Sequence, residues 1–153
     1  MARNVITYGT FDMFHVGHLR LLQRLRNLGD RLIVAVSTDE FNAAKNKKAI
    51  IPYEGRAEIV GSLKIVDQVI PEHSWDQKAA DIKKYDISVF GIGDDWSGKF
   101  DHLKVHCEVV YLPRTPDVSS SALRRMARAL DPEMIERLRE VHAVLDQMVR
   151  NFE

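Results

Sequence analysis

Five short apolar runs alternate along the chain with segments of helical periodicity. The runs cover Val5–Tyr8, Leu32–Val36, Gln68–Ile70, Ser88–Ile92 and Val109–Leu112. Their apolar residues are largely continuous instead of alternating with polar ones, as strands buried on both faces require. The pattern therefore predicts an α/β fold in which helices flank a parallel sheet.

Two segments show helical patterns that bear on the organisation of the chain. The first begins near His15 and carries leucines three residues apart at Leu19, Leu22, Leu25 and Leu28. The second begins at Asp131 and Pro132, which suit an N-cap and a first helical position. Its apolar positions alternate in steps of four and three: Met134, Leu138, Val141, Leu145, Met148 and Phe152.

We interpret these apolar positions as a packing seam on an extra C-terminal helix, which lies either on its own domain or on a partner subunit. The expected division is a domain over residues 1–130 and the helix over residues 131–153. A chain of 153 residues is long enough for one domain with a substantial core.

The charge balance restricts the partners of the chain. Acidic and basic residues each number 22, so the formal net charge is zero and no overall field attracts nucleic acid or an anionic membrane. Any anion site must be local. Cys107 is the only cysteine, and neither a signal segment nor an apolar run of membrane-spanning length is evident, which favours the reducing cytoplasm.

Polar segments follow the predicted strands at residues 9–12, 37–48, 93–96 and 114–121. Ligands of open parallel sheets bind outside the carboxyl ends of the strands, so we expect these segments to converge on one site. His15 and His18 lie in the first turn of the predicted helix, where backbone N–H groups and the helix dipole favour a phosphate. Gly9, Thr10 and Gly17 offer a hydroxyl and close backbone approach to such a ligand.

Other interpretations of these histidines are open. His15 and His18 also suit ordinary capping or core residues, or a metal-binding pair. A zinc site at His102, His106 and Cys107 would require that segment to be helical, and no second pair of ligands is evident around it.

Two motifs about a hundred residues apart resemble those of one enzyme family. The segment GTFDMFHVGH at residues 9–18 is similar to the GTFDxxHxGH signature of the cytidylyltransferase group of nucleotidyltransferases. RTPDVSSS at residues 114–121 is similar to their RTxGxST segment. The segments VSTDEFN, VDQVIPE and GDDWSGKFD are similar to the corresponding segments of those members of the group that act on glycerol 3-phosphate.

The resemblance implies a Rossmann-like fold and a direct transfer reaction. The phosphate of sn-glycerol 3-phosphate would attack the α-phosphorus of CTP, giving pyrophosphate and CDP-glycerol, a precursor of teichoic acid or capsule polymers. A homodimer is also implied, and we expect Mg²⁺ or another divalent cation with the nucleotide. Alternatives are another acceptor (ethanolamine phosphate or a sugar phosphate), ATP in place of CTP, and a nucleotide-binding regulatory module.

The resemblance assigns roles to residues at matching motif positions. The catalytic residues would be His15, His18, Lys45 and Arg114. The acceptor would be bound by Lys45, Lys78 and Arg56. The nucleotide would be bound by the histidines and Arg114, together with Gly9, Thr10, Phe11, Gly17, Lys47, Thr115, Ser119, Ser120 and Ser121.

Some positions are left open by the sequence. Asp117 replaces the usual glycine of the second motif and adds a negative charge near the expected triphosphate. Trp75 and Trp96 suit either stacking on a ligand or packing in the core. Five carboxylates near strand ends could hold Mg²⁺ through water or orient histidines and lysines: Asp12, Asp39, Asp67, Asp94 and Asp95.

Overall fold

The computed structural model describes residues 2–115, 122–123, 125–126 and 132–150. The chain divides into two compact units, Met1–Val118 and Ser119–Glu153. The first unit contains a five-stranded sheet in the order β3-β2-β1-β4-β5, and all neighbouring strands are parallel. The strands are β1 (Asn4–Gly9), β2 (Arg31–Ser37), β3 (Gln68–Glu72), β4 (Ile87–Gly93) and β5 (Glu108–Leu112).

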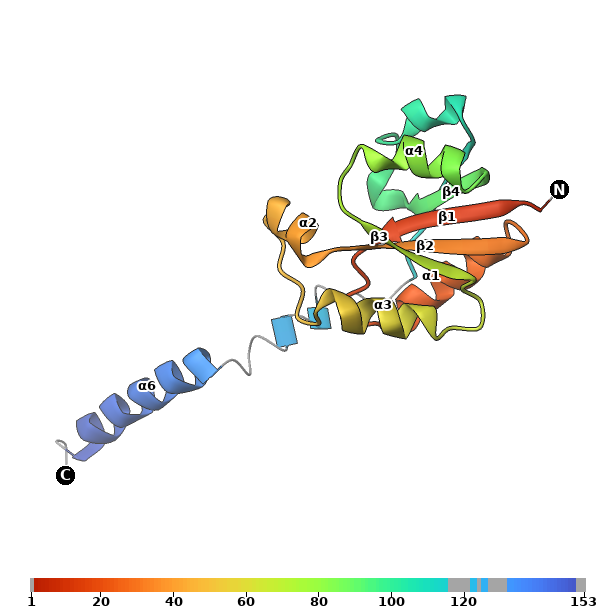
Figure 1. Ribbon diagram of the computed structural model, residues 1–153. Helices are drawn as coiled ribbons and strands as arrows, with labels where there is room; N and C mark the ends of the chain where they lie inside the picture. Colours follow the sequence, from red (N-terminus) through yellow and green to blue (C-terminus); the bar gives the residue numbers. More distant parts are fainter. Residues whose placement is uncertain (1, 116–121, 124, 127–131, 151–153) are drawn as a thin grey trace. The chain divides into compact units, whose positions relative to one another are not determined.

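Helices cover both faces of this sheet (Figure 1). Leu22 and Leu25 of α1 (Val16–Arg26) and Val60 of α3 (Tyr53–Gly61) pack against one face. Ile82 of α4 (Gln77–Lys84) and Leu103 of the 3₁₀ helix η2 (Asp101–Val105) pack against the other. Burial on both sides explains why the strands are continuously apolar. The prediction of a Rossmann-like α/β fold is confirmed.

The first helix ends earlier than its leucine pattern predicts. It stops at Arg26, and the N–H of Leu28 donates to Leu25 O in a tighter turn. The chain then passes close to the start of β1, where Asp30 N donates to Arg3 O at 2.8 Å. A Cβ on Gly29 would lie 2.3 Å from Arg3 O, so this approach requires glycine.

The second unit contains the C-terminal helix α6 (Pro132–Arg150). Its start at Pro132 agrees with the sequence, whereas the expected N-cap Asp131 and the last seam residue Phe152 lie outside the described residues. Arg137 and Glu133 form an ion pair along the helix. The partner of the apolar seam and the boundary at residue 130 stay predictions. Among the residues described, no helix is long and apolar enough to cross a membrane.

Candidate active site

The loop after β1 begins the candidate site. Phe11 and Met13 have positive φ angles of 52° and 48°, which residues other than glycine rarely adopt. Phe11 is buried, and a Cβ on Gly9 would lie 2.9 Å from its ring atom Cε2. The packing of Phe11 therefore explains why position 9 is a glycine, and the sequence did not reveal this explanation. Close approach of a phosphate to Gly9 stays a prediction.

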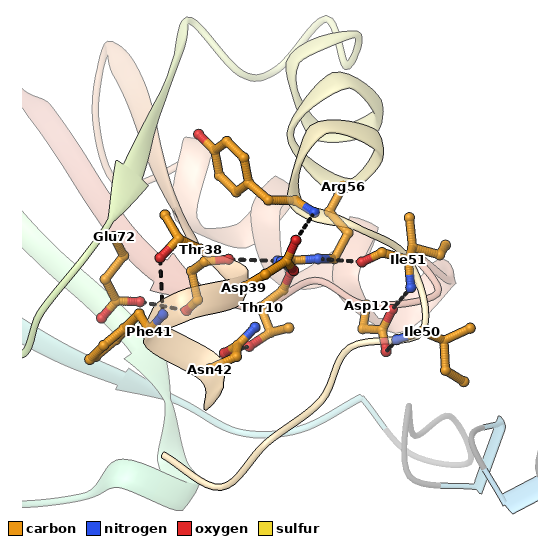
Figure 2. Close-up of polar contacts among 12 residues, drawn as sticks. Thr10, Asp12, Thr38, Asp39, Phe41, Asn42, Ile50, Ile51, Arg56 and Glu72 are labelled. Carbon is orange, nitrogen blue, oxygen red and sulfur yellow. Dashed lines mark hydrogen bonds and ion pairs between the residues drawn. The ribbon is translucent and has the colours of Figure 1, made fainter. Parts of the chain in front are cut away.

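Asp12 ties this loop to the segment before α3 (Figure 2). It is 2% exposed, and its carboxylate accepts hydrogen bonds from the backbone N–H groups of Ile50 at 2.9 Å and Ile51 at 3.0 Å. Both contacts give the buried carboxylate hydrogen-bond partners from the backbone. Asp12 is thus a structural anchor in this arrangement.

Replacing Asp12 with asparagine should lower the free energy of unfolding by about 1–3 kcal/mol. The amide keeps one acceptor but turns an NH₂ group toward the second backbone N–H, which is left unsatisfied. Urea unfolding followed by circular dichroism measures the change. Asp30→Asn is the control, because the exposed Asp30 carboxylate accepts only from Arg3 N among the contacts described. Equal stability of the two variants would contradict the prediction.

His15 and His18 form a capping box at the start of α1. His15 is the N-cap, and its Nδ1 accepts from Gly17 N at 3.0 Å. Nδ1 of His18 accepts from His15 N at 3.3 Å. The two rings are stacked with centroids 3.9 Å apart. The capping interpretation therefore holds for the Nδ1 atoms, and the structure brings the two predicted catalytic rings together.

The caps also determine which nitrogen of each ring can donate. Because both Nδ1 atoms accept hydrogen bonds, a neutral ring carries its N–H at Nε2. Burial lowers the pKa of His15 below its ordinary value, which favours the neutral form of this ring. A neutral imidazole with its proton at Nε2 is a hydrogen-bond donor for a phosphate oxygen.

We expect the His15 ring to titrate below its ordinary pKa of about 6.5. The unfolded chain then binds more protons than the folded chain between the two pKa values, so the stability should fall as the pH drops through this range. Long-range ¹H–¹⁵N NMR of histidine reports both the midpoint and the tautomer. A midpoint above about 6.5, or a neutral ring protonated at Nδ1, would contradict this prediction.

Arg56 lies at the centre of the polar contacts in Figure 2. Its side chain is 0% exposed. Nε donates to Ile51 O at 2.8 Å, and Nη1 donates to Thr10 O at 2.7 Å and to Ser37 O at 2.8 Å. Nη2 pairs with the Asp39 carboxylate at 2.8 Å. Arg56 thus joins α3 to the loop after β1, to the end of β2 and to α2, which favours a supporting role. Its predicted contact with the acceptor stays a prediction.

The predicted lysines follow α2 (Asp39–Ala44), which comes directly after β2. Asn42 O accepts from the backbone N–H groups of Lys45 at 3.0 Å and Lys47 at 2.8 Å. The Thr10 hydroxyl donates to Asn42 Oδ1 at 3.1 Å (Figure 2). Asn42 therefore connects the loop after β1 to the lysines, a role that the motif VSTDEFN alone did not indicate.

The Lys45 ammonium lies against aromatic rings. Its Nζ is 4.0 Å from the centroid of Phe41 and 5.3 Å from that of Trp75. Burial lowers the pKa of Lys45, and the negative charge of Glu72 partly opposes this shift. Lys47 lies nearby, with Nζ 6.0 Å from the ring of Trp96 after β4. The segments after β1, β2 and β4 therefore converge, as the sequence predicts.

Lys78 is held inside the protein. It is 3% exposed, and its Nζ donates to Glu72 Oε1 at 2.7 Å. Its Nζ also lies 4.4 Å from the centroid of Tyr8 and 4.9 Å from that of Trp75. The sequence did not predict this buried ion pair, and contact between Lys78 and an acceptor stays a prediction.

Both tryptophans border the lysines. Trp96 packs against the hydrophobic core, in agreement with the core interpretation, and its ring centroid is 5.5 Å from that of Trp75. Trp75 is 44% exposed, so part of its surface is open to a ligand. This exposure leaves stacking by Trp75 as a prediction.

Arg114 lies beyond the end of β5 and pairs across to the segment after β4. Its Nε donates to Asp95 Oδ2 at 2.8 Å, and Nη2 contacts the same oxygen. Thr115 follows it directly. The other residues of the second motif, Asp117, Ser119, Ser120 and Ser121, lie outside the described residues, so their predicted roles remain untested.

The carboxylates that could bind a metal are largely engaged by protein donors. Asp12 binds backbone N–H groups, Asp39 pairs with Arg56, Asp67 accepts from Leu32 N, and Asp95 pairs with Arg114. Within the described part of the chain, no three His, Cys, Asp or Glu residues are grouped to hold a metal ion. The alternative of a zinc site at His102, His106 and Cys107 therefore gains no support, and the expected Mg²⁺ and its ligands stay a prediction.

Comparisons with known proteins agree with the motifs. The sequence profile of the family described as cytidylyltransferase-like matches residues 6–126. A glycerol-3-phosphate cytidylyltransferase of Bacillus spizizenii is 56% identical over 123 residues, covering 80% of this chain and 95% of the relative. The enzyme of the same name from Staphylococcus aureus is 51% identical over 123 residues, covering 80% and 93%.

More distant proteins share parts of the likeness. An FAD synthase of Thermococcus onnurineus is 30% identical over 146 residues, covering 90% of this chain and 92% of the relative. A solved structure of a lipopolysaccharide core biosynthesis protein from Thermoplasma volcanium has a TM-score of 0.64 at 24% identity, covering 75% of this chain and 99% of the other. This structural likeness supports the fold alone.

Proposed function

The chain belongs to the cytidylyltransferase-like family, and we propose from this premise that it transfers the cytidylyl group of CTP to sn-glycerol 3-phosphate. The products are CDP-glycerol and pyrophosphate. One observation carries the assignment: glycerol-3-phosphate cytidylyltransferases are 51% and 56% identical to the chain over 80% of its length. The names of these relatives do not favour the alternatives, which are another acceptor, ATP in place of CTP, and a nucleotide-binding regulatory module.

The reaction brings two anions together. A phosphate oxygen of glycerol 3-phosphate attacks the α-phosphorus of CTP, and the bond from this phosphorus to the pyrophosphate oxygen breaks. Negative charge accumulates on the non-bridging and leaving oxygens, so the protein contributes mainly placement and fixed positive donors. No covalent enzyme intermediate is needed.

We assign the nucleotide phosphates to the start of α1. The Nε2–H groups of His15 and His18 donate to CTP phosphate oxygens and to the charge that develops in the transition state. The capping box supports this role because it fixes both rings through Nδ1. Lys47 and Arg114 add positive charge on the nucleotide side, which requires Arg114 to exchange its Asp95 contact for phosphate.

We assign the acceptor phosphate to Lys45. Its Nζ lies against the Phe41 and Trp75 rings, and Trp75 is partly exposed. In this proposal the ammonium binds the phosphate, and the Trp75 ring offers an apolar surface beside it. A compact ammonium suits a mobile phosphate group. Mg²⁺ enters as part of the CTP substrate, because it keeps several waters and is commonly shared with substrate phosphates.

Pyrophosphate release tests the proposed function. CTP with glycerol 3-phosphate should give robust release, whereas UTP or ATP with the same acceptor should give little. Ethanolamine phosphate and a sugar phosphate, each supplied with CTP, serve as acceptor controls. Release only with another acceptor or nucleotide, or tight CTP binding without turnover, would overturn the proposal.

We further propose that the protein is a cytoplasmic homodimer. The unpaired Cys107 suits a reducing compartment, and the seam of α6 offers an apolar helical surface for a second subunit. Sedimentation velocity of the full chain should give the mass of a dimer. Leu138→Glu combined with Leu145→Glu tests the seam: a shift to monomer supports it, and an unchanged dimer assigns the interface elsewhere.

A further inference from the structure

A chain of buried polar groups lies behind Lys45. Lys78 Nζ donates to Glu72 Oε1 at 2.7 Å, and the Ser37 hydroxyl donates to Glu72 Oε2 at 2.7 Å. Lys45 Nζ in turn donates to Ser37 Oγ at 3.5 Å. The four residues come from α4, β3, β2 and the end of α2. Ser37, Glu72 and Lys78 are 1%, 3% and 3% exposed, whereas Lys45 is only partly buried.

The direction of these hydrogen bonds orients the serine. Ser37 has one hydroxyl proton, and the Glu72 carboxylate can only accept, so the proton points toward Glu72. The lone pairs of Ser37 Oγ then remain for a donor, and Lys45 is that donor. Glu72 thereby turns a freely rotating hydroxyl into a fixed acceptor for the lysine.

The charges around Lys45 also give Glu72 a role in its function. Burial lowers the pKa of Lys45, and the positive charges of Lys47, Lys78 and Arg56 lower it further. Glu72 is the negative group that raises it. The carboxylate therefore favours the protonated lysine that a phosphate acceptor needs.

We infer that Ser37 and Glu72 are positioning residues that hold the Lys45 ammonium toward the acceptor phosphate. This inference rests on the proposed function, because it concerns the lysine assigned there to glycerol 3-phosphate. Neither side chain needs to touch the acceptor, since both are buried and act through Lys45. The Glu72–Lys78 pair anchors the far end of the chain on α4.

Ser37→Ala tests the geometric part. This variant leaves the Glu72–Lys78 pair intact and removes only the hydroxyl that donates to Glu72 Oε2. The KM for glycerol 3-phosphate should rise about tenfold, as expected for losing a hydrogen bond to a charged donor, with less than about a twofold change in the KM for CTP. Thr7→Val is the matched control: Thr7 in β1 is equally buried, its hydroxyl has no partner among the residues described, and neither KM should change.

Glu72→Gln tests the electrostatic part. Removing the negative charge should move the alkaline limb of kcat/KM for glycerol 3-phosphate to lower pH, because Lys45 then loses its proton more readily. A purely structural defect would reduce the amount of active enzyme at every pH without moving the limb. A thermal melt of each variant measures the folded fraction.

The outcomes separate the two proposals. No pyrophosphate from the original protein with CTP and glycerol 3-phosphate would remove the proposed function itself. An active original protein whose Ser37→Ala variant keeps its acceptor KM, or whose Glu72→Gln variant keeps its alkaline limb, would overturn the inference alone. An equal rise in the KM for glycerol 3-phosphate and in the KM for CTP in the Ser37→Ala variant would also overturn the inference.

Discussion

Replacing His18 with alanine should lower kcat by about a hundredfold or more. The ring sits in the first turn of α1 with Nδ1 accepting from the His15 backbone N–H, so a neutral ring carries its own N–H at Nε2. Losing that donor removes stabilisation of charge that develops only in the transition state, which lowers kcat more than it raises KM. Steady-state pyrophosphate release with saturating CTP measures the loss.

Two further variants separate catalysis from capping at this position. Asparagine places an acceptor near the original Nδ1 and should preserve the cap without restoring kcat. Glutamine places an amide N–H near the original Nε2 and should recover part of kcat. His106→Ala controls for the loss of an exposed histidine. Near-normal kcat in His18→Ala or full activity in His18→Asn would contradict the assigned role.

Replacing Arg56 with methionine should lower the free energy of unfolding by about 3–5 kcal/mol. Methionine keeps an unbranched apolar stem but has no donors, so three backbone carbonyls and the Asp39 carboxylate lose the hydrogen bonds from the guanidinium. Two of these acceptors are the carbonyls of Thr10, after β1, and of Ser37, at the end of β2. We therefore expect the loss to exceed that of an ordinary surface arginine.

Arg31→Met is the control for this prediction. Arg31 is exposed and donates to Gln68 Oε1 at 2.7 Å, so its loss should cost about 0.5 kcal/mol or less. Arg56→Lys should fall between, because one ammonium cannot reproduce the planar fork of donors. Urea unfolding gives all three values, and a similar small loss at both arginines would contradict the prediction.

The sequence predicted the sheet well for a physical reason. Strands such as 32–36 and 88–92 are buried on both faces, so their apolar character is continuous and easily distinguished from the flanking helices. The position of the first helix was also readable, because a capping histidine precedes a regular leucine repeat. Its end was not, since that depends on how closely Gly29 approaches Arg3 in space.

The supporting residues of the site were much harder to predict. The motifs drew attention to His15, His18 and Lys45 because their chemistry suits phosphate. The sequence predicted that Arg56 binds the acceptor, which stays a prediction; it did not reveal the hydrogen bonds of Arg56 to backbone carbonyls, because only the fold brings these groups together. Glu72 and Ser37 are 35 residues apart, and only the pairing of β2 with β3 makes them neighbours.

The central place of β1 in the sheet has a consequence for synthesis on the ribosome. Its β2 neighbour follows at once through α1, but the strand on its other side, β4, begins only at Ile87. At about 5–20 residues per second, one edge of the first strand waits several seconds for its partner. The histidine-bearing loop thus emerges early, yet it acquires its full sheet support only when the second half of the fold has been made.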